Sequence, residues 1–292
     1  MCDEDTVNDV EAFEKKSNNF SRRQFNTLTA SAAIAAMLPA VANAKTVSES
    51  NVVITTPDGE ADCYFVHPSS GKHPAVLIWP DILGLRPAFR QMGKRLAESG
   101  YAVLVVNPYY RSAKSPVVKE GDSFQDPDVR SSVLPFYRAL SAETTTTDAG
   151  AMVNFLDSQN VVDTNKKVGT IGYCMGGPMT LLTAAAIPDR IGAVGSFHGG
   201  GLVTEEASSP HLLIPNMNAH FLVAIADNDD AKYPEVKGVL RKAYDAAGLK
   251  AEIEVYEGAL HGWCPPDSRA YHEVQAERAW SRLLAIFGGA LA

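Results

Sequence analysis

The hydrophobic positions of this chain follow two alternating patterns. Short continuous apolar runs, typical of buried parallel strands, lie at residues 75–79, 102–106, 168–172, 191–197, 219–226 and 251–256. Apolar residues at helical spacing lie between or after them, at residues 89–99, about 148–158, 176–187, 235–247 and 271–287. Strands that alternate with helices predict an α/β fold built on a mostly parallel sheet.

Two regions depart from this alternation. Residues 52–55 and 61–66 flank the turn signal Pro57-Asp58-Gly59, which predicts an N-terminal hairpin. Residues 111–147 are irregular apart from an apolar patch at 133–140, so we interpret them as an excursion with one helix that shapes a substrate pocket. Together the patterns predict about eight strands, with helices on both faces, in a single domain over residues 45–292.

Residues 1–44 carry the pattern of an export signal. Arg22 and Arg23 precede an apolar run from about residue 28 to 41, and the small residues of 42–44 (ANA) form a cleavage signature. The arginine pair resembles a twin-arginine signal, which predicts transfer by that export machinery, cleavage after Ala44 and a periplasmic protein. The run is shorter than the ~20 residues of a membrane span, so no stable insertion is expected after cleavage. An uncleaved anchor is the alternative.

Charge and cysteine content exclude several classes of function. The formal net charge is −8. Nucleic-acid-binding proteins carry a basic face, so we expect no nucleic-acid partner. No cysteine pair has metal-ligand spacing, so we expect no metal and no cofactor. Three of the four cysteines, Cys63, Cys174 and Cys264, lie beyond the signal, so at least one is unpaired or pairs between chains. Whether Cys63 or Cys264 forms a disulfide is left open.

A cysteine stands where a catalytic nucleophile is expected. The sequence at 172–176 (GYCMG) follows a predicted strand and opens a predicted helix, which is the spacing of a nucleophile elbow. Glycines on both sides allow the sharp, strained turn that this position needs. At a helix N-terminus the thiolate is favoured and an oxyanion can be bound. Cys174 is therefore the candidate nucleophile.

A histidine and an acidic residue follow in the order that this arrangement requires. His261 comes just after the last predicted strand, at the carboxyl edge of the sheet. Asp227, Asp229 and Asp230 follow the preceding strand, and Asp229 fits the turn spacing of the fold best. The acid would hold the imidazole in the required tautomer and stabilise its charge. Asp227 and Asp230 remain alternatives to Asp229.

Four motifs together resemble the dienelactone hydrolase family in order and spacing. They are residues 79–85 (WPDILGL), 100–110 (GYAVLVVNPYY), 172–177 (GYCMGG) and 257–263 (EGALHGW). The resemblance extends from about residue 52 to the C-terminus and implies an α/β-hydrolase fold. It also implies a Cys-His-Asp triad, carried here by Cys174, His261 and Asp229.

The resemblance assigns further roles around the nucleophile. It implies an oxyanion hole formed by the backbone N–H groups of Ile82 and Met175. It also implies an acid that interacts with the resting thiol, at the position of Asp81, where well-known members have Glu. Arginines that grip a substrate carboxylate in those members do not map onto this chain.

Residues for substrate binding follow less directly. Arg130, His198 and Trp263 are the candidates, and the dienelactone substrate itself is not carried over. We therefore predict an ester or lactone hydrolase that forms a thioacyl-enzyme intermediate. The alternatives are a non-catalytic ligand-binding protein of the same fold and a redox-active thiol protein in which Cys174 pairs with Cys264.

Overall fold

A computed structural model describes Asp9 and residues 38–292 of the chain. The predicted arginine pair at 22–23 and residues 28–37 of the predicted apolar run lie outside the described residues. One eight-stranded sheet forms the centre of the molecule, in the order β1-β2-β4-β3-β5-β6-β7-β8. The strands are β1 (Val47–Thr56), β2 (Gly59–Pro68), β3 (Ala75–Trp79), β4 (Ala102–Val105), β5 (Val168–Tyr173), β6 (Ile191–Phe197), β7 (His220–Ala226) and β8 (Ala251–Tyr256).

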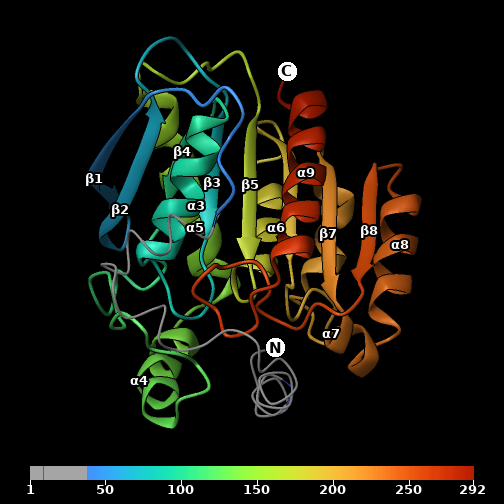
Figure 1. Cartoon of the computed structure of the whole chain (residues 1–292). Helices are drawn as coiled ribbons and strands as arrows, with labels where there is room; N and C mark the ends of the chain where they lie inside the picture. The colour runs from blue at the N-terminus through green and yellow to red at the C-terminus, as the bar shows by residue number, and fades with distance from the viewer. Residues whose placement is uncertain (1–8, 10–37) are drawn as a thin grey trace.

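Only the N-terminal hairpin breaks the parallel arrangement of this sheet. β1 pairs with β2 and β2 with β4 in antiparallel register, whereas each pairing from β4 to β8 is parallel. Parallel strands place their carboxyl ends at one edge of the sheet, which is the lower edge in Figure 1. The connections that leave this edge carry the functional side chains, as expected for open α/β sheets.

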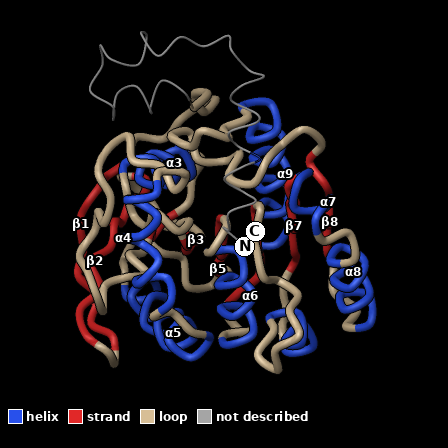
Figure 2. The backbone as a smooth tube through the Cα atoms, turned by 90° about the horizontal axis from the view of Figure 1, so that it is seen from below, coloured by secondary structure: helices blue, strands red, loops and turns tan. Residues whose placement is uncertain are grey.

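Helices cover both faces of the sheet because each parallel crossover returns over one face or the other (Figure 2). Helices α3 and α9 pack on one face, and α5, α6 and α8 pack on the other. α4 projects below the carboxyl edge in Figure 1. The helices are α3 (Pro87–Glu98), α4 (Pro127–Arg138), α5 (Ala142–Ser158), α6 (Gly176–Ala186), α7 (Asp227–Lys232), α8 (Val236–Ala246), α9 (Glu273–Ala290) and the 3-10 helix η2 (Pro210–Asn216).

The alternation of side chains along the strands separates the core into two layers. In β3, Leu77 and Trp79 face the α5/α6 layer, whereas Val76 and Ile78 face the α3/α9 layer. All four side chains are buried, as the continuous apolar run predicts for a strand covered on both faces. The predicted α/β-hydrolase fold, with its eight strands, is confirmed.

Two local expectations needed correction. α5 begins at Ala142, earlier than predicted, because Ser141 caps it: Ser141 Oγ accepts from the Thr144 N–H, and Thr144 Oγ1 accepts from the Ser141 N–H. The three aspartates within residues 227–230, whose spacing indicated a turn after the strand, form the first turn of the short helix α7, which the sequence pattern did not predict. Within the described residues, no helix combines the length and apolarity that crossing a membrane requires.

Candidate active site

Cys174 lies on a strained turn between β5 and α6. Its φ of 52° is in the left-handed region that non-glycine residues rarely adopt. Close packing explains the two flanking glycines: a Cβ on Gly172 would lie 2.0 Å from the Gly176 carbonyl oxygen, and a Cβ on Gly176 would lie 2.2 Å from that of Trp79. The turn thus places the sulfur at the N-terminus of α6, near the end of β3.

His261 is held by two neighbours from the segment that follows β7. Its Nδ1 lies 2.7 Å from Oδ2 of Asp229, and its backbone N–H donates to Oδ1 of Asn228 over 2.8 Å. With Nδ1 bound in this way, the other ring nitrogen is the one available to Cys174, with which the ring also makes a side-chain hydrogen bond. Sequence reasoning missed Asn228, although it lies within the aspartate cluster that was singled out.

The other two aspartates have different partners. Asp227 accepts from the Gly258 N–H over 2.9 Å, and Asp230 accepts from Lys237. Of the three candidates, Asp229 is therefore the one whose carboxylate contacts the His261 ring.

The charges around His261 favour its protonated form. Burial alone would lower the pKa of His261, but the negative charges of Asp229 and Cys174, with hydrogen bonds to both, raise it to about 10. A protonated imidazole beside the sulfur in turn favours the thiolate. The arrangement therefore places a protonated imidazole beside the sulfur of Cys174.

Ile82 and Met175, the two residues predicted to form an oxyanion hole, line the same pocket as Cys174. No acceptor among the described residues takes a hydrogen bond from the N–H of Ile82 or of Met175. Tyr109, which sequence reasoning missed, ties these two residues together: its hydroxyl lies 2.8 Å from the Ile82 carbonyl oxygen and 3.1 Å from Sδ of Met175. Tyr109 belongs to the motif at 100–110, but the contact joins distant segments, so no local pattern marks it.

Asp81 is bound to an arginine. Its Oδ1 and Oδ2 accept from Nη1 and Nη2 of Arg86 over 2.6 and 2.9 Å, and Oδ1 also accepts from the Leu83 N–H. Burial raises the pKa of Asp81, and the charge of Cys174 raises it further, against the lowering effect of Arg86. Asp81 therefore interacts with Cys174 through charge, while its carboxylate is turned to Arg86.

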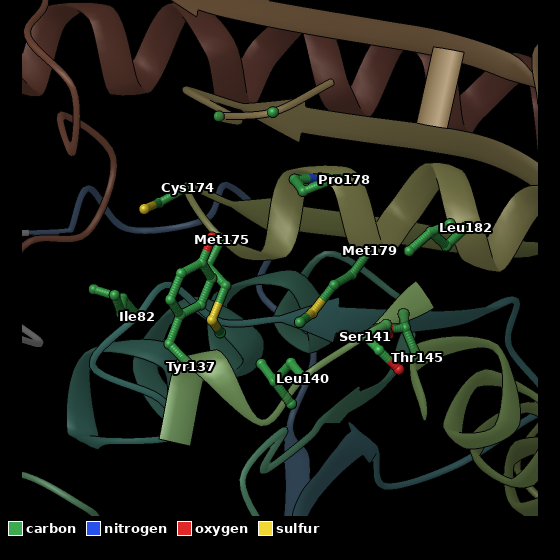
Figure 3. A pocket seen from close by; sticks show the side chains of 12 residues that line it. Ile82, Tyr137, Leu140, Ser141, Thr145, Cys174, Met175, Pro178, Met179 and Leu182 are labelled. Atoms are coloured by element: carbon green, nitrogen blue, oxygen red, sulfur yellow. The ribbon is translucent and has the colours of Figure 1, made fainter. Parts of the chain in front are cut away.

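A pocket adjoins Cys174 (Figure 3). Its wall combines residues after β3 and β5 with the end of α4, the start of α5 and one side of α6. The lining residues are Ile82, Tyr137, Leu140, Ser141, Thr145, Cys174, Met175, Pro178, Met179, Leu182, Gly200 and Gly201. This described lining is mostly apolar and contains no Asp, Glu, Lys, Arg or His side chain.

The three predicted substrate-binding residues lie outside this lining. Arg130 is on α4, and its Nη1 is buried without a partner among the described residues. His198 and Trp263 are buried behind His261, where the His198 ring lies 5.2 Å from each of the other two rings, centre to centre. Burial, and next the charge of His261, lowers the pKa of His198 well below its ordinary value, so this ring stays neutral.

No disulfide joins the cysteines of the described residues. Cys63, Cys174 and Cys264 are all buried. Cys174 belongs to the α5/α6 layer of the core, whereas Cys264 belongs to the α3/α9 layer. A Cys174–Cys264 bridge is thus absent here. Across residues 38–292, no group of three or more His, Cys, Asp and Glu side chains is placed to hold a metal ion.

Comparison with known proteins points to one family. A family model described as the dienelactone hydrolase family matches residues 61–291. A Salmonella typhi relative, named provisionally as a carboxymethylenebutenolidase, is 28% identical over 254 residues, covering 80% of this chain and 90% of its own length. A Pseudomonas putida relative named carboxymethylenebutenolidase is 26% identical over 223 residues, covering 74% and 86%.

Solved structures agree on the fold. A Klebsiella pneumoniae structure, named provisionally as a dienelactone hydrolase, aligns with a TM-score of 0.72 at 22% identity, covering 84% of this chain and 99% of its own. At that identity the likeness establishes the shared fold.

Proposed function

Because this chain belongs to the dienelactone hydrolase family and is a lactone or ester hydrolase, we propose that it acts through a Cys174-His261-Asp229 triad and a thioacyl-enzyme intermediate. One observation carries the proposal: the sulfur on the strained turn before α6 shares a hydrogen bond with an imidazole whose other nitrogen is held by a carboxylate. Nucleophile, base and orienting acid in contact are the arrangement that nucleophilic catalysis requires.

Each step of the reaction has a residue to perform it. The Cys174 thiolate attacks the carbonyl carbon, and the N–H groups of Ile82 and Met175 bind the oxyanion that forms. The carbon–oxygen bond to the alcohol then breaks, and the protonated His261 gives its proton to the leaving oxygen. A water then gives one proton to His261 and attacks the thioester carbonyl, the carbon–sulfur bond breaks, and the acid leaves; the Cys174 thiolate and the protonated His261 are thereby restored.

The composition of the pocket beside Cys174 favours an uncharged substrate group. Moving a charge into an apolar pocket is costly unless an opposite charge is present, and the described lining offers none. Tyr137 and Met179 provide apolar surface, and the hydroxyls of Ser141 and Thr145 lie at the end remote from Cys174 (Figure 3). We therefore propose uncharged esters or lactones as substrates, rather than a lactone that bears a carboxylate.

A substrate panel on two cysteine variants tests the proposal. Neutral p-nitrophenyl esters and simple lactones are compared with an ester of matched length that carries a terminal carboxylate. We expect the wild type to prefer the neutral compounds by at least about tenfold in kcat/KM. Cys174→Ala should lose at least ~100-fold in rate, with an unchanged circular dichroism spectrum.

The matched control is Cys264→Ala, which removes a buried thiol from the other layer of the core and should keep most of the activity. Turnover that survives in Cys174→Ala would reject the nucleophile. A folded wild type that binds but hydrolyses no compound of the panel would identify a ligand-binding protein. A preference for the carboxylate-bearing ester would reject the neutral substrate class.

A further inference from the structure

Arg86 joins the loop that carries Ile82 to the loop that follows His261. It stands at the N-terminus of α3, five residues after Asp81. Besides its two hydrogen bonds to Asp81, its Nε and Nη2 donate to Oδ2 and Oδ1 of Asp267 over 2.7 and 2.9 Å. One guanidinium therefore binds two carboxylates from segments that are remote in sequence.

This bridge is buried and geometrically specific. Arg86 is 5% exposed, and both of its contacts are the paired fork that arginine makes with carboxylates. Arg86 Nη1 also donates to the Gly84 carbonyl oxygen over 3.3 Å, and the Gly84 N–H donates to the Asp81 carbonyl oxygen. The loop around Ile82 is thus fixed internally and, through Asp267, fixed to the segment after His261.

Buried ion pairs often contribute little net stability, because the cost of removing the charges from water offsets their attraction. Two loops of the proposed active site meet at Arg86. One carries the Ile82 N–H, and the other follows His261. A donor for a developing oxyanion must be held within a fraction of an ångström to be effective. Arg86 is therefore placed where it can fix the position of the Ile82 N–H relative to His261.

We propose that Arg86 is a positioning residue, which holds the Ile82 loop against the loop after His261 through Asp81 and Asp267. Bound in this way, the Asp81 carboxylate stays turned away from the sulfur of Cys174. The inference rests on the proposed function, because it assumes that the Ile82 N–H serves the reaction.

A second ion pair of the same kind provides the control. Arg95, also on α3, donates to both carboxylate oxygens of Glu277 on α9 over 2.6 Å each. Asp267 and Glu277 are similar in exposure, with side chains 24% and 28% accessible. Arg95 and Glu277 line a separate cavity between α3 and α9 and do not line the pocket beside Cys174.

The experiment compares Arg86→Gln and Asp267→Asn with Arg95→Gln and Glu277→Gln. Asp267→Asn is included because its partly exposed site tolerates the change if Arg86→Gln fails to fold. Measured on the full chain, Arg86→Gln and Asp267→Asn should lower kcat about 10- to 100-fold, a range typical of displaced catalytic groups. KM should change by less than about threefold, since the pocket wall is untouched.

Backbone amide exchange gives a readout independent of activity. Exchange should accelerate at residues 81–86 and 262–270 in Arg86→Gln and Asp267→Asn, and at neither segment in the two control variants. The inference is overturned if kcat and exchange stay at wild-type values, or if the Arg95 and Glu277 variants lose kcat equally. A wild type without turnover would instead refute the proposed function.

Discussion

Asp229 and Asp230 are adjacent aspartates on α7 with different partners: one binds the ring of His261 and the other binds Lys237. The charge of Asp229 contributes to the raised pKa of His261, and its oxygen fixes the ring nitrogen that faces Cys174. The two residues are therefore a matched pair for testing what the acid does.

We expect Asp229→Asn to lower kcat/KM about 100-fold or more, because the imidazolium loses its counter-charge and its orienting acceptor. Asp230→Asn should stay within about threefold of the wild type, since Asp230 contacts Lys237 and leaves His261 alone. Steady-state kinetics with a neutral ester measures both. Equal losses in the two variants would mean that the acidic cluster acts as a whole and that Asp229 has no special role.

The same pair of variants tests the pH dependence of stability. His261 titrates near its ordinary pKa of 6.5 when unfolded and at about 10 when folded. The stabilisation from its protonated form is thus complete below pH 6.5 and is lost as the pH rises towards 10. Asp229→Asn should reduce the free energy of unfolding by about 2 kcal/mol at pH 6, and by less at pH 10. Urea titrations of the wild type and Asp229→Asn at pH 6 and pH 10 measure these losses. A larger loss of unfolding free energy at pH 10 than at pH 6 would contradict the prediction.

Residue identity and spacing were enough to select Cys174 and His261 and to narrow the acid to Asp227, Asp229 or Asp230, because each follows a strand that a continuous apolar run marks. The contact with the His261 ring distinguishes Asp229 from the other two. The partners that hold them were not predictable in this way. Tyr109 and Arg86 act through contacts with segments far away in the sequence, and nothing local distinguishes such a side chain from an ordinary core or surface residue. The sequence identified Asp81 by its position in the motif. It could not show that the Asp81 carboxylate points to Arg86.

At the scale of elements, the meeting of α6 with the end of β3 sets the position of the nucleophile. Gly176 opens α6 so close to β3 that any side chain would overlap the carbonyl oxygens of Trp79 and Pro80, at 2.2 and 2.7 Å. Gly150, inside α5, has no atom within 4 Å of its would-be Cβ. Both glycines are helical, so they share their backbone preference and differ in packing.

Gly176→Ala should therefore destabilise the protein by about 3 kcal/mol or more, because backbone atoms must move to admit the methyl group. Activity should be lost as well, since the carbonyls that it displaces lie just before Ile82. Gly150→Ala should stabilise the protein by about 0.5–1 kcal/mol through the higher helix propensity of alanine. Urea unfolding and ester hydrolysis measure both, and a well-folded, active Gly176→Ala would refute the packing argument.

Element boundaries were less predictable than element types. The apolar runs predict the strands well because a strand covered on both faces is apolar at every position. α5 begins before its apolar pattern does, since the Ser141–Thr144 capping pair starts the helix within a polar stretch. α7 has no buried residue at all, so no hydrophobic period could have revealed it.

At the scale of the whole molecule, all eight strands of the described sheet lie after Lys45. The Lys45 N–H donates to the Glu98 carbonyl oxygen at the end of α3, and β1 begins at Val47. Of residues 38–44, Leu38 packs against the α3/α9 layer and is partly buried. Cleavage after Ala44 would thus leave every strand of the described sheet in place and remove the partly buried Leu38 from the edge of the core.

We accordingly expect a chain that begins at Lys45 in the periplasm of a host with twin-arginine export, detected by mass spectrometry of fractionated cells. Replacing Arg22 and Arg23 together by lysine should leave most of the protein unprocessed in the cytoplasm, because that machinery reads the arginine pair itself. The matched control replaces Lys15 and Lys16 by arginine, which alters the upstream basic pair and should leave export intact. Full-length protein in the membrane fraction would identify an uncleaved anchor, and processed periplasmic protein from the Arg22→Lys/Arg23→Lys variant would exclude the twin-arginine route.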